Sequence, residues 1–306
     1  MPPTIPPPSA SGHTRTTAHP LYWALYGPAD APPIVVLHGG PGAHHDYLLP
    51  QMLRMGETHP LLFYDQRGGG RSRAEGREAV TWQSHVDDLA AIVREFDVTP
   101  FTLAGYSWGG LLALFYAVEA AERHDLPAPD RMILIDPAPI SREYRTAYEE
   151  EYARRQSAGE ILAMRERLAA SGLREQDPAA YRQRAFELSV AGYFADPAAT
   201  TDLTPFRVIG RVQQSVWDSL GDYDLRESLG RVEAPTLIVH GRQDPIPLAS
   251  SEAAARALPD ARLVVLEHAG HVPYVEQPDA LFAAIDGFLA DTADTPLLRH
   301  RHDRQG

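Results

Sequence analysis

The chain has 306 residues, 44% of them hydrophobic, which is enough for one large core with or without a smaller appended unit. Its formal net charge of −13 argues against nucleic acid and anionic membrane surfaces as partners. The absence of cysteine excludes a thiol nucleophile, a disulfide framework and cysteine-ligated metal sites.

The two ends of the chain have compositions typical of segments outside a folded core. Residues 1–19 form a proline-rich extension that lacks the hydrophobic core of a signal peptide, and residues 292–306 are predicted to be a polar tail. No apolar run approaches the roughly 18 residues that a membrane span needs. We therefore expect a cytoplasmic protein that does not enter a membrane.

Short apolar runs alternate with helical patterns in two stretches of the chain, residues 20–140 and 234–291. The predicted strands are residues 34–37, 61–64, 101–104, 132–135, 236–239 and 263–266. The predicted helices include residues 82–96, 248–257 and 278–289. Continuous apolar strands separated by helices predict an α/β fold with a mostly parallel sheet and helices on both faces.

Between these two stretches, residues 141–233 are helical in pattern, charged and without a convincing strand. This segment follows the carboxyl end of a predicted strand, which is the face of an α/β sheet where ligand sites lie. The position favours a helical cap over the site, and the alternative is a peripheral insertion that does not contact it.

A candidate nucleophile lies between a predicted strand and a predicted helix. Residues 103–110 read Leu-Ala-Gly-Tyr-Ser-Trp-Gly-Gly and contain the motif Gly105-x-Ser107-x-Gly109. In a nucleophile elbow the serine occupies a strained strand-to-helix turn, and its flanking positions leave no room for large side chains. The turn lifts the hydroxyl off the sheet and directs the helix N-terminus at an anion formed there.

A serine nucleophile needs a base, and the base needs an orienting acid. Asp244 and His271 follow the last two predicted strands, so both belong to loops at the same sheet edge as Ser107. His268 and His240 are the alternatives for the base. Asp136 and Asp65, which also follow strands, are the alternatives for the acid. We expect Asp65 to pair with an arginine of its own loop instead.

A candidate oxyanion hole follows the strand at residues 34–37, where the sequence reads His38-Gly-Gly-Pro-Gly42. Glycines allow close approach of backbone to substrate, and Pro41 has no N–H to donate. The amides of Gly40 and Trp108 are therefore the predicted donors. These glycines do not match a nucleotide-binding loop.

Several motifs together resemble the proline iminopeptidases and their α/β-hydrolase relatives. They are His38-Gly-Gly-Pro-Gly42, Asp65-Gln-Arg-Gly68, Gly70-Arg71-Ser72, Gly105-x-Ser-Trp-Gly-Gly110, Gly241-x-x-Asp244 and Gly270-His271. The resemblance spans residues 20–291 and implies the α/β-hydrolase fold with a Ser107–His271–Asp244 triad and no metal or organic cofactor. Tyr106 departs from the small residue expected there in many of these peptidases.

The resemblance also implies an aminopeptidase whose cap carboxylates hold the free α-amino group of a short peptide. The cap offers Glu143, Glu149, Glu150, Glu151 and Glu187, and none of them lies in a motif that carries this role over. Glu187, between Phe186 and Leu188, is the first candidate for a carboxylate facing the pocket. An esterase or lactonase acting on a small uncharged acyl compound is the alternative, and a non-enzymatic ligand receptor is a third. The sequence does not specify an oligomeric state.

Overall fold

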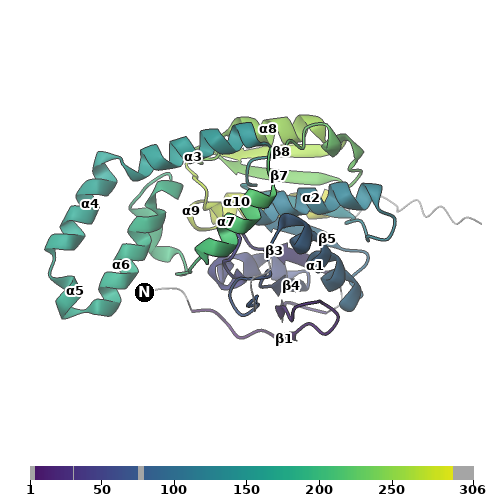
Figure 1. The fold of residues 1–306 in the computed structure, drawn as a ribbon, viewed down its shortest axis with the longest axis horizontal. Coiled ribbons are helices and arrows are strands. Elements are labelled where there is room, and N and C mark those ends of the chain that lie inside the picture. Colours follow the sequence, from purple (N-terminus) through teal and green to yellow (C-terminus); the bar gives the residue numbers. More distant parts are fainter. Residues whose placement is uncertain (1–3, 30, 75–78, 292–306) are drawn as a thin grey trace, which may run out of the picture.

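The computed structural model describes residues 4–29, 31–74 and 79–291. A single sheet in the order β1-β2-β4-β3-β5-β6-β7-β8 runs through this part of the chain (Figure 1). Its strands are β1 Ala10–His13, β2 Tyr22–Tyr26, β3 Ile34–Leu37, β4 Leu61–Tyr64, β5 Thr102–Tyr106, β6 Arg131–Ile135, β7 Thr236–Gly241 and β8 Ala261–Leu266. The six strands from β3 to β8 pair in parallel, which confirms the predicted fold class.

The first two strands form an antiparallel edge that the apolar pattern does not predict. β1 pairs with β2, and β2 pairs with β4. β1 falls inside the predicted extension of residues 1–19, so the sheet begins earlier than the predicted core. The signal is missing because β1 is short and mostly exposed, with Gly12 packed beneath the Trp23 side chain.

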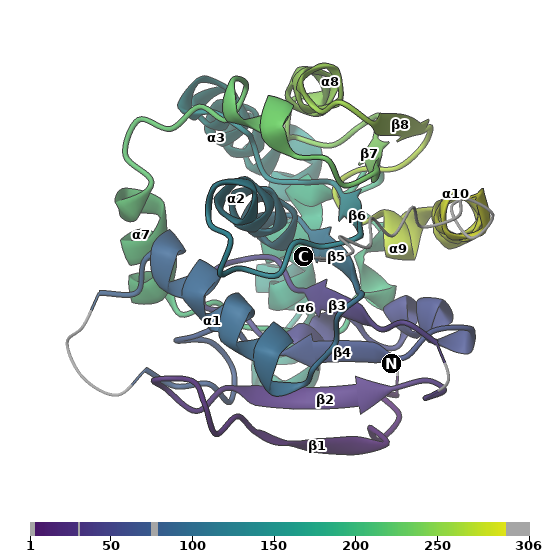
Figure 2. The ribbon, with the colours of Figure 1, turned by 90° about the vertical axis from the view of Figure 1, so that its right-hand side faces the viewer.

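Helices cover both faces of the sheet, as Figure 2 shows. On one face α1 Trp82–Glu95, α2 Trp108–Glu122 and α8 Leu248–Ala257 contribute buried side chains to one core cluster. On the other face α10 Pro278–Asp291 packs with the short helices η1 His45–Leu48 and η2 Gln51–Glu57. The central strands β3, β4, β5 and β7 are buried at every position, as expected for strands covered on both faces.

The helical insertion, residues 141–233, lies between β6 and β7 along the chain. It consists of α3 Arg142–Gln156, α4 Gly159–Ala170, α5 Leu173–Gln176, α6 Pro178–Val190, η3 Ala191–Tyr193, η4 Ala199–Asp202, α7 Gly210–Ser219 and η5 Ser228–Arg231. Helices α3 to α6 extend away from the sheet in Figure 1. Within α3 no residue is buried, and α4 buries only Ile161.

The remaining helix, α9 Pro273–Glu276, precedes α10. The predicted tail at residues 292–306 lies outside the described residues. In the described part of the chain, no helix combines the length and the apolar character that crossing a membrane requires.

Candidate active site

Ser107 occupies the turn between β5 and α2, with backbone angles φ 54° and ψ −119°. Such a left-handed φ is costly for a residue other than glycine and persists only where the surroundings enforce it. The flanking glycines show how the turn is packed. A Cβ on Gly105 would collide with the carbonyl oxygen of Gly109, and a Cβ on Gly109 would collide with that of Leu37. The local sequence therefore holds the Ser107 side chain clear of the sheet.

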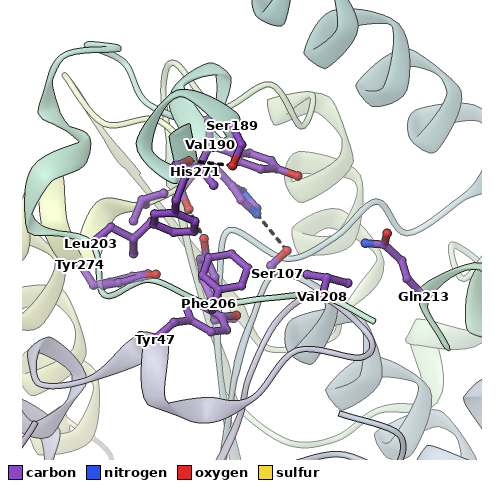
Figure 3. A pocket seen from close by; sticks show the side chains of 15 residues that line it. Tyr47, Ser107, Ser189, Val190, Leu203, Phe206, Val208, Gln213, His271 and Tyr274 are labelled. Carbon is purple, nitrogen blue, oxygen red and sulfur yellow. Dashed lines mark hydrogen bonds between the residues drawn. The ribbon is translucent and has the colours of Figure 1, made fainter. Parts of the chain in front are cut away.

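The structure brings Ser107, His271 and Asp244 together in one hydrogen-bonded chain. The Ser107 Oγ lies 2.9 Å from His271 Nε2, a bond drawn in Figure 3. His271 Nδ1 lies 2.8 Å from Asp244 Oδ2, and Asp244 Oδ1 accepts the Ile246 N–H at 2.7 Å. The loops after β5, β7 and β8 supply the three side chains, because these parallel strands end at one edge of the sheet.

Burial keeps the His271 imidazole in the form that a general base needs. Desolvation lowers the pKa of His271 to about 4, so the ring is neutral near pH 7. In the neutral tautomer that satisfies both bonds, Nδ1–H donates to Asp244 and Nε2 accepts the Ser107 hydroxyl proton. This arrangement can transfer the serine proton to the imidazole and stabilise the resulting imidazolium.

The predicted oxyanion donors lie beside Ser107. Gly40 lines the pocket with φ 58°, and Trp108 is the first residue of α2, where a backbone N–H has no partner inside the helix. The neighbouring Gly39 N–H is not free, since it donates to the Tyr47 hydroxyl at 2.7 Å. Gly40 thus lines the same cavity as Ser107, and the Trp108 amide directly follows Ser107 in the chain.

A buried glutamine connects the two halves of this candidate oxyanion hole, and the sequence patterns did not single it out. Gln66 Nε2 donates to the His38 carbonyl at 2.7 Å, and its Oε1 accepts the Trp108 indole N–H at 2.8 Å. The Gln66 backbone N–H donates to His38 Nε2 at 3.0 Å. The only available signal was the joint presence of the His-Gly-Gly-Pro-Gly and Asp-Gln-Arg-Gly motifs, which does not indicate that they touch.

The alternative bases lie elsewhere. His240 is buried, with Nε2 3.1 Å from the Ile246 carbonyl oxygen and Nδ1 2.9 Å from the Ser251 hydroxyl. His268 is exposed on its turn. Neither ring contacts Ser107.

The alternative acids differ from each other. Asp65 bonds to the His45 ring at 2.6 Å and to Arg71 Nε at 3.0 Å, which confirms the expected arginine pairing. Asp136 lies close to the proposed triad. Oxygens of Asp136 and Asp244 and a ring nitrogen of His271 all lie within 4.8 Å of one another. Among the described residues this is the one His/Asp/Glu cluster compact enough to surround a metal ion, and His271 and Asp244 already bond each other.

A cavity of about 250 Å³ opens beside Ser107. In Figure 3, Leu203 and Tyr274 lie to one side of Ser107 and Gln213 to the other. The lining residues come from the core loops and from the helical insertion, and they are Gly40, Tyr47, Tyr106, Ser107, Phe186, Ser189, Val190, Tyr193, Leu203, Phe206, Val208, Gln213, His271, Val272 and Tyr274. Among the described residues that line it, none is an aspartate, glutamate or arginine.

The expectation that Glu187 faces this pocket is wrong. Glu187 is buried, but Gln183 Nε2 donates to it at 3.0 Å and Arg184 Nη1 at 2.7 Å, both from the preceding turn of α6. The pocket face of α6 carries Phe186, Ser189 and Val190, which have the i, i+3, i+4 spacing of one helix face. Glu187 lies beside this face of α6, and its side chain is not among those that line the pocket.

The other glutamates of the insertion named above are also absent from the pocket lining. Glu149 and Glu151 pair with arginines of their own helix, and Glu143 pairs with Arg226. Glu150 is exposed. No carboxylate of this group is thus available to a substrate amine in the cavity.

The family model described as alpha/beta hydrolase fold matches residues 32–278. The chain therefore belongs to the α/β-hydrolase family and is a hydrolase. Within that family it is similar to proline iminopeptidases, as the motifs predicted. The enzyme of Levilactobacillus brevis is 27% identical over 297 residues, covering 89% of this chain and 94% of the relative. That of Neisseria meningitidis is 28% identical over 326 residues, covering 93% and 98%.

Solved structures extend the likeness to the fold. The crystal structure of a proline iminopeptidase from Mycobacterium smegmatis matches with a TM-score of 0.68. The match covers 93% of this chain and 100% of that one, at 22% identity.

Proposed function

We propose that the protein is a serine hydrolase that works through an acyl-enzyme on Ser107. The observation that carries the proposal is the unbroken hydrogen-bonded chain from Ser107 through His271 to Asp244 at the wall of a cavity. His271 takes the serine proton as Oγ attacks a carbonyl carbon, and Asp244 holds the imidazole. The N–H groups of Gly40 and Trp108 donate to the tetrahedral oxyanion.

The second half of the cycle uses the same groups. The C–O or C–N bond to the leaving group breaks as His271 returns the proton to it, leaving Ser107 acylated. A water molecule then gives its proton to His271 and attacks the ester, and Ser107 recovers its proton when the acid leaves. The helical insertion acts in this proposal as a cap that supplies the outer wall of the pocket.

The composition of the pocket favours a small, uncharged acyl group. Its lining is dominated by aromatic and aliphatic side chains, with hydroxyl and amide groups as the polar members. Burying an ammonium group there without a carboxylate would be costly, because a desolvated charge needs a partner. This supports hydrolysis of a carboxylic ester or lactone.

Proline iminopeptidase activity is the second candidate, favoured by the 27% and 28% identity to proline iminopeptidases over most of the chain. Such an activity would require another group to accept the substrate amine, such as the amide of Gln213 or the hydroxyl of Tyr193.

The two candidates can be separated with three substrates that share a naphthyl reporter: proline naphthylamide, its N-acetylated form and a short-chain naphthyl ester. Faster turnover of the ester, with little difference between the two amides, is the expected result. A preference of tenfold or more for the free amine over its acetylated form would move the protein to the aminopeptidase class. Failure to hydrolyse any of them, with no labelling by a fluorophosphonate, would overturn the serine hydrolase proposal.

A further inference from the structure

Asp136 is a buried acid next to the proposed triad for which the mechanism above has no use. It follows β6, is 0% exposed and adopts φ 41°. Its backbone N–H donates to the Val239 carbonyl at 2.8 Å, and its Oδ1 accepts the Gly241 N–H at 2.7 Å. A residue other than glycine in this backbone region, pinned on both sides, is held in place by its surroundings.

No cation among the described residues compensates Asp136. Its Oδ2 has no donor, although it is completely buried. The nearest basic group is His240, whose Nδ1 lies 3.8 Å from Asp136 Oδ1. His240 is neutral, because burial lowers its pKa to about 4, and its Nε2–H is directed at the Ile246 carbonyl. An ionised Asp136 would therefore be a buried charge with one N–H donor, which is strongly unfavourable.

The neighbouring acid supplies the missing partner. Oxygens of Asp136 and Asp244 lie within 4.8 Å of each other, and two carboxylates at such a distance inside a protein cannot both be ionised without a large cost. Asp244 is the better site for the negative charge, since it accepts the Ile246 N–H and faces His271 Nδ1.

We propose that Asp136 is a neutral carboxylic acid whose O–H donates to the Asp244 carboxylate, which makes Asp136 a positioning residue for the triad acid. Three donors, from Ile246, His271 and Asp136, then fix the orientation of Asp244. The pair carries a single negative charge, which is the charge available to stabilise the imidazolium.

Burial raises the pKa of both acids, that of Asp244 to about 8, but the hydrogen bond between them lowers the pKa of Asp244 and raises that of Asp136, which favours the charge on Asp244. Burial raises the pKa of Asp136 well above its ordinary value, and the nearby Asp244 raises it further. The titratable groups that face Asp136 are Asp244, His271, His240, Tyr106 and Tyr274. None of the five is a permanent cation.

The part of this inference that concerns catalysis rests on the proposed function, and paired variants test it. In Asp136→Asn the amide N–H can replace the acid O–H as donor to Asp244, whereas Asp136→Leu removes the donor at similar volume. We expect kcat of Asp136→Leu to be about 10- to 100-fold below that of the wild type, with KM little changed, as for other groups that orient a reacting residue. Asp136→Asn should recover most of that loss.

Two further readouts need no substrate, so they remain informative if the hydrolase assignment fails. The infrared spectrum near pH 7 should contain the carbonyl stretch of a buried protonated carboxylic acid in the wild type and lose it in Asp136→Asn. The melting temperature of Asp136→Asn minus that of the wild type should also rise from about pH 6 to about pH 9. In this pH range the folded wild type holds a proton on Asp136 that the unfolded chain has released, so its stability falls as pH rises. The Asn variant binds no such proton and lacks this fall.

Absence of the infrared band together with parallel melting curves would overturn the proposal. A loss of activity in Asp136→Asn equal to that in Asp244→Asn would also contradict it, because it would assign the orienting role to an ionised Asp136.

Discussion

The loops that end the core strands and the helices of the insertion differ in how their charged groups are placed. Asp244, His271 and Asp65 are buried, and each is held by two or more hydrogen bonds. In the insertion, Glu149, Glu151 and Glu187 instead pair with arginines one helical turn away, and α3 buries no residue. The reacting groups therefore belong to a buried, hydrogen-bonded part of the molecule, whereas the pocket wall belongs to an insertion whose helices α3 and α4 bury almost nothing.

The largest expected effect belongs to the core serine. Ser107→Ala should lower kcat by about 10⁵-fold or more and abolish labelling by a fluorophosphonate, since the proposed nucleophile is lost. Ser189→Ala is the matched control from the insertion, because Ser189 also lines the pocket but its hydroxyl donates to the Phe186 carbonyl. Stoichiometric labelling of the Ser107 variant would show that the nucleophile lies elsewhere.

Two buried aspartates should respond to the same change in different ways. Asp244→Asn should lower kcat by about 10⁴-fold with little effect on folding, because the imidazole then takes the wrong tautomer. Asp65→Asn should instead reduce the free energy of unfolding by about 2 kcal/mol or more, since it weakens a buried network with His45 and Arg71. Steady-state kinetics and urea unfolding of both variants check the contrast, and a reversal of the two phenotypes would contradict it.

The pH dependence of kcat/KM should reflect the burial of His271. The neutral form of His271 accepts the serine proton, so activity is lost as pH falls through its pKa, which burial lowers to about 4. We expect kcat/KM to stay level from about pH 7 to about pH 5.5 and then to fall about tenfold per pH unit below the pKa. An acid limb with an apparent pKa at or above the ordinary histidine value would mean that water or a carboxylate stabilises the protonated ring.

The smallest effect concerns the pocket wall. Val190 lines the pocket and is 7% exposed, so Val190→Glu would add the carboxylate that the cavity lacks. We expect this variant to raise the preference for a free over an acetylated amine by about tenfold, at a cost to stability of about 1–3 kcal/mol from burying a charge. Glu187→Gln is the control and should leave the preference unchanged. A large change in the control would restore Glu187 as a substrate-binding residue.

The parts of the molecule that could be predicted from the sequence are those with local signals. Each of the strands from β3 to β8 is an apolar run, and Ser107 is marked by glycines whose contacts leave no space for a side chain. Asp244 and His271 could be placed because the carboxyl ends of parallel strands lie at one edge of the sheet, so residues that follow such strands lie near each other there.

The rest depends on contacts that no local pattern encodes. Gln66 acts through two partners far away in sequence, His38 and Trp108. The side of α6 to which Glu187 points could not be predicted, because its neighbours Phe186 and Leu188 are both apolar and do not show which face of the helix is buried. In α3 and α4 almost nothing is buried, so no apolar stripe marks the face that turns toward the core.

The insertion is nevertheless tied to both loops that carry the acid and the base. The His271 backbone N–H donates to the Tyr193 carbonyl of η3 at 2.7 Å, and Arg155 of α3 donates to the Gln243 carbonyl next to Asp244. The amide proton of His271 is therefore shielded from solvent only while η3 stays in place. Its rate of hydrogen–deuterium exchange would measure, at a single residue, how often the wall of the pocket detaches from the catalytic loop.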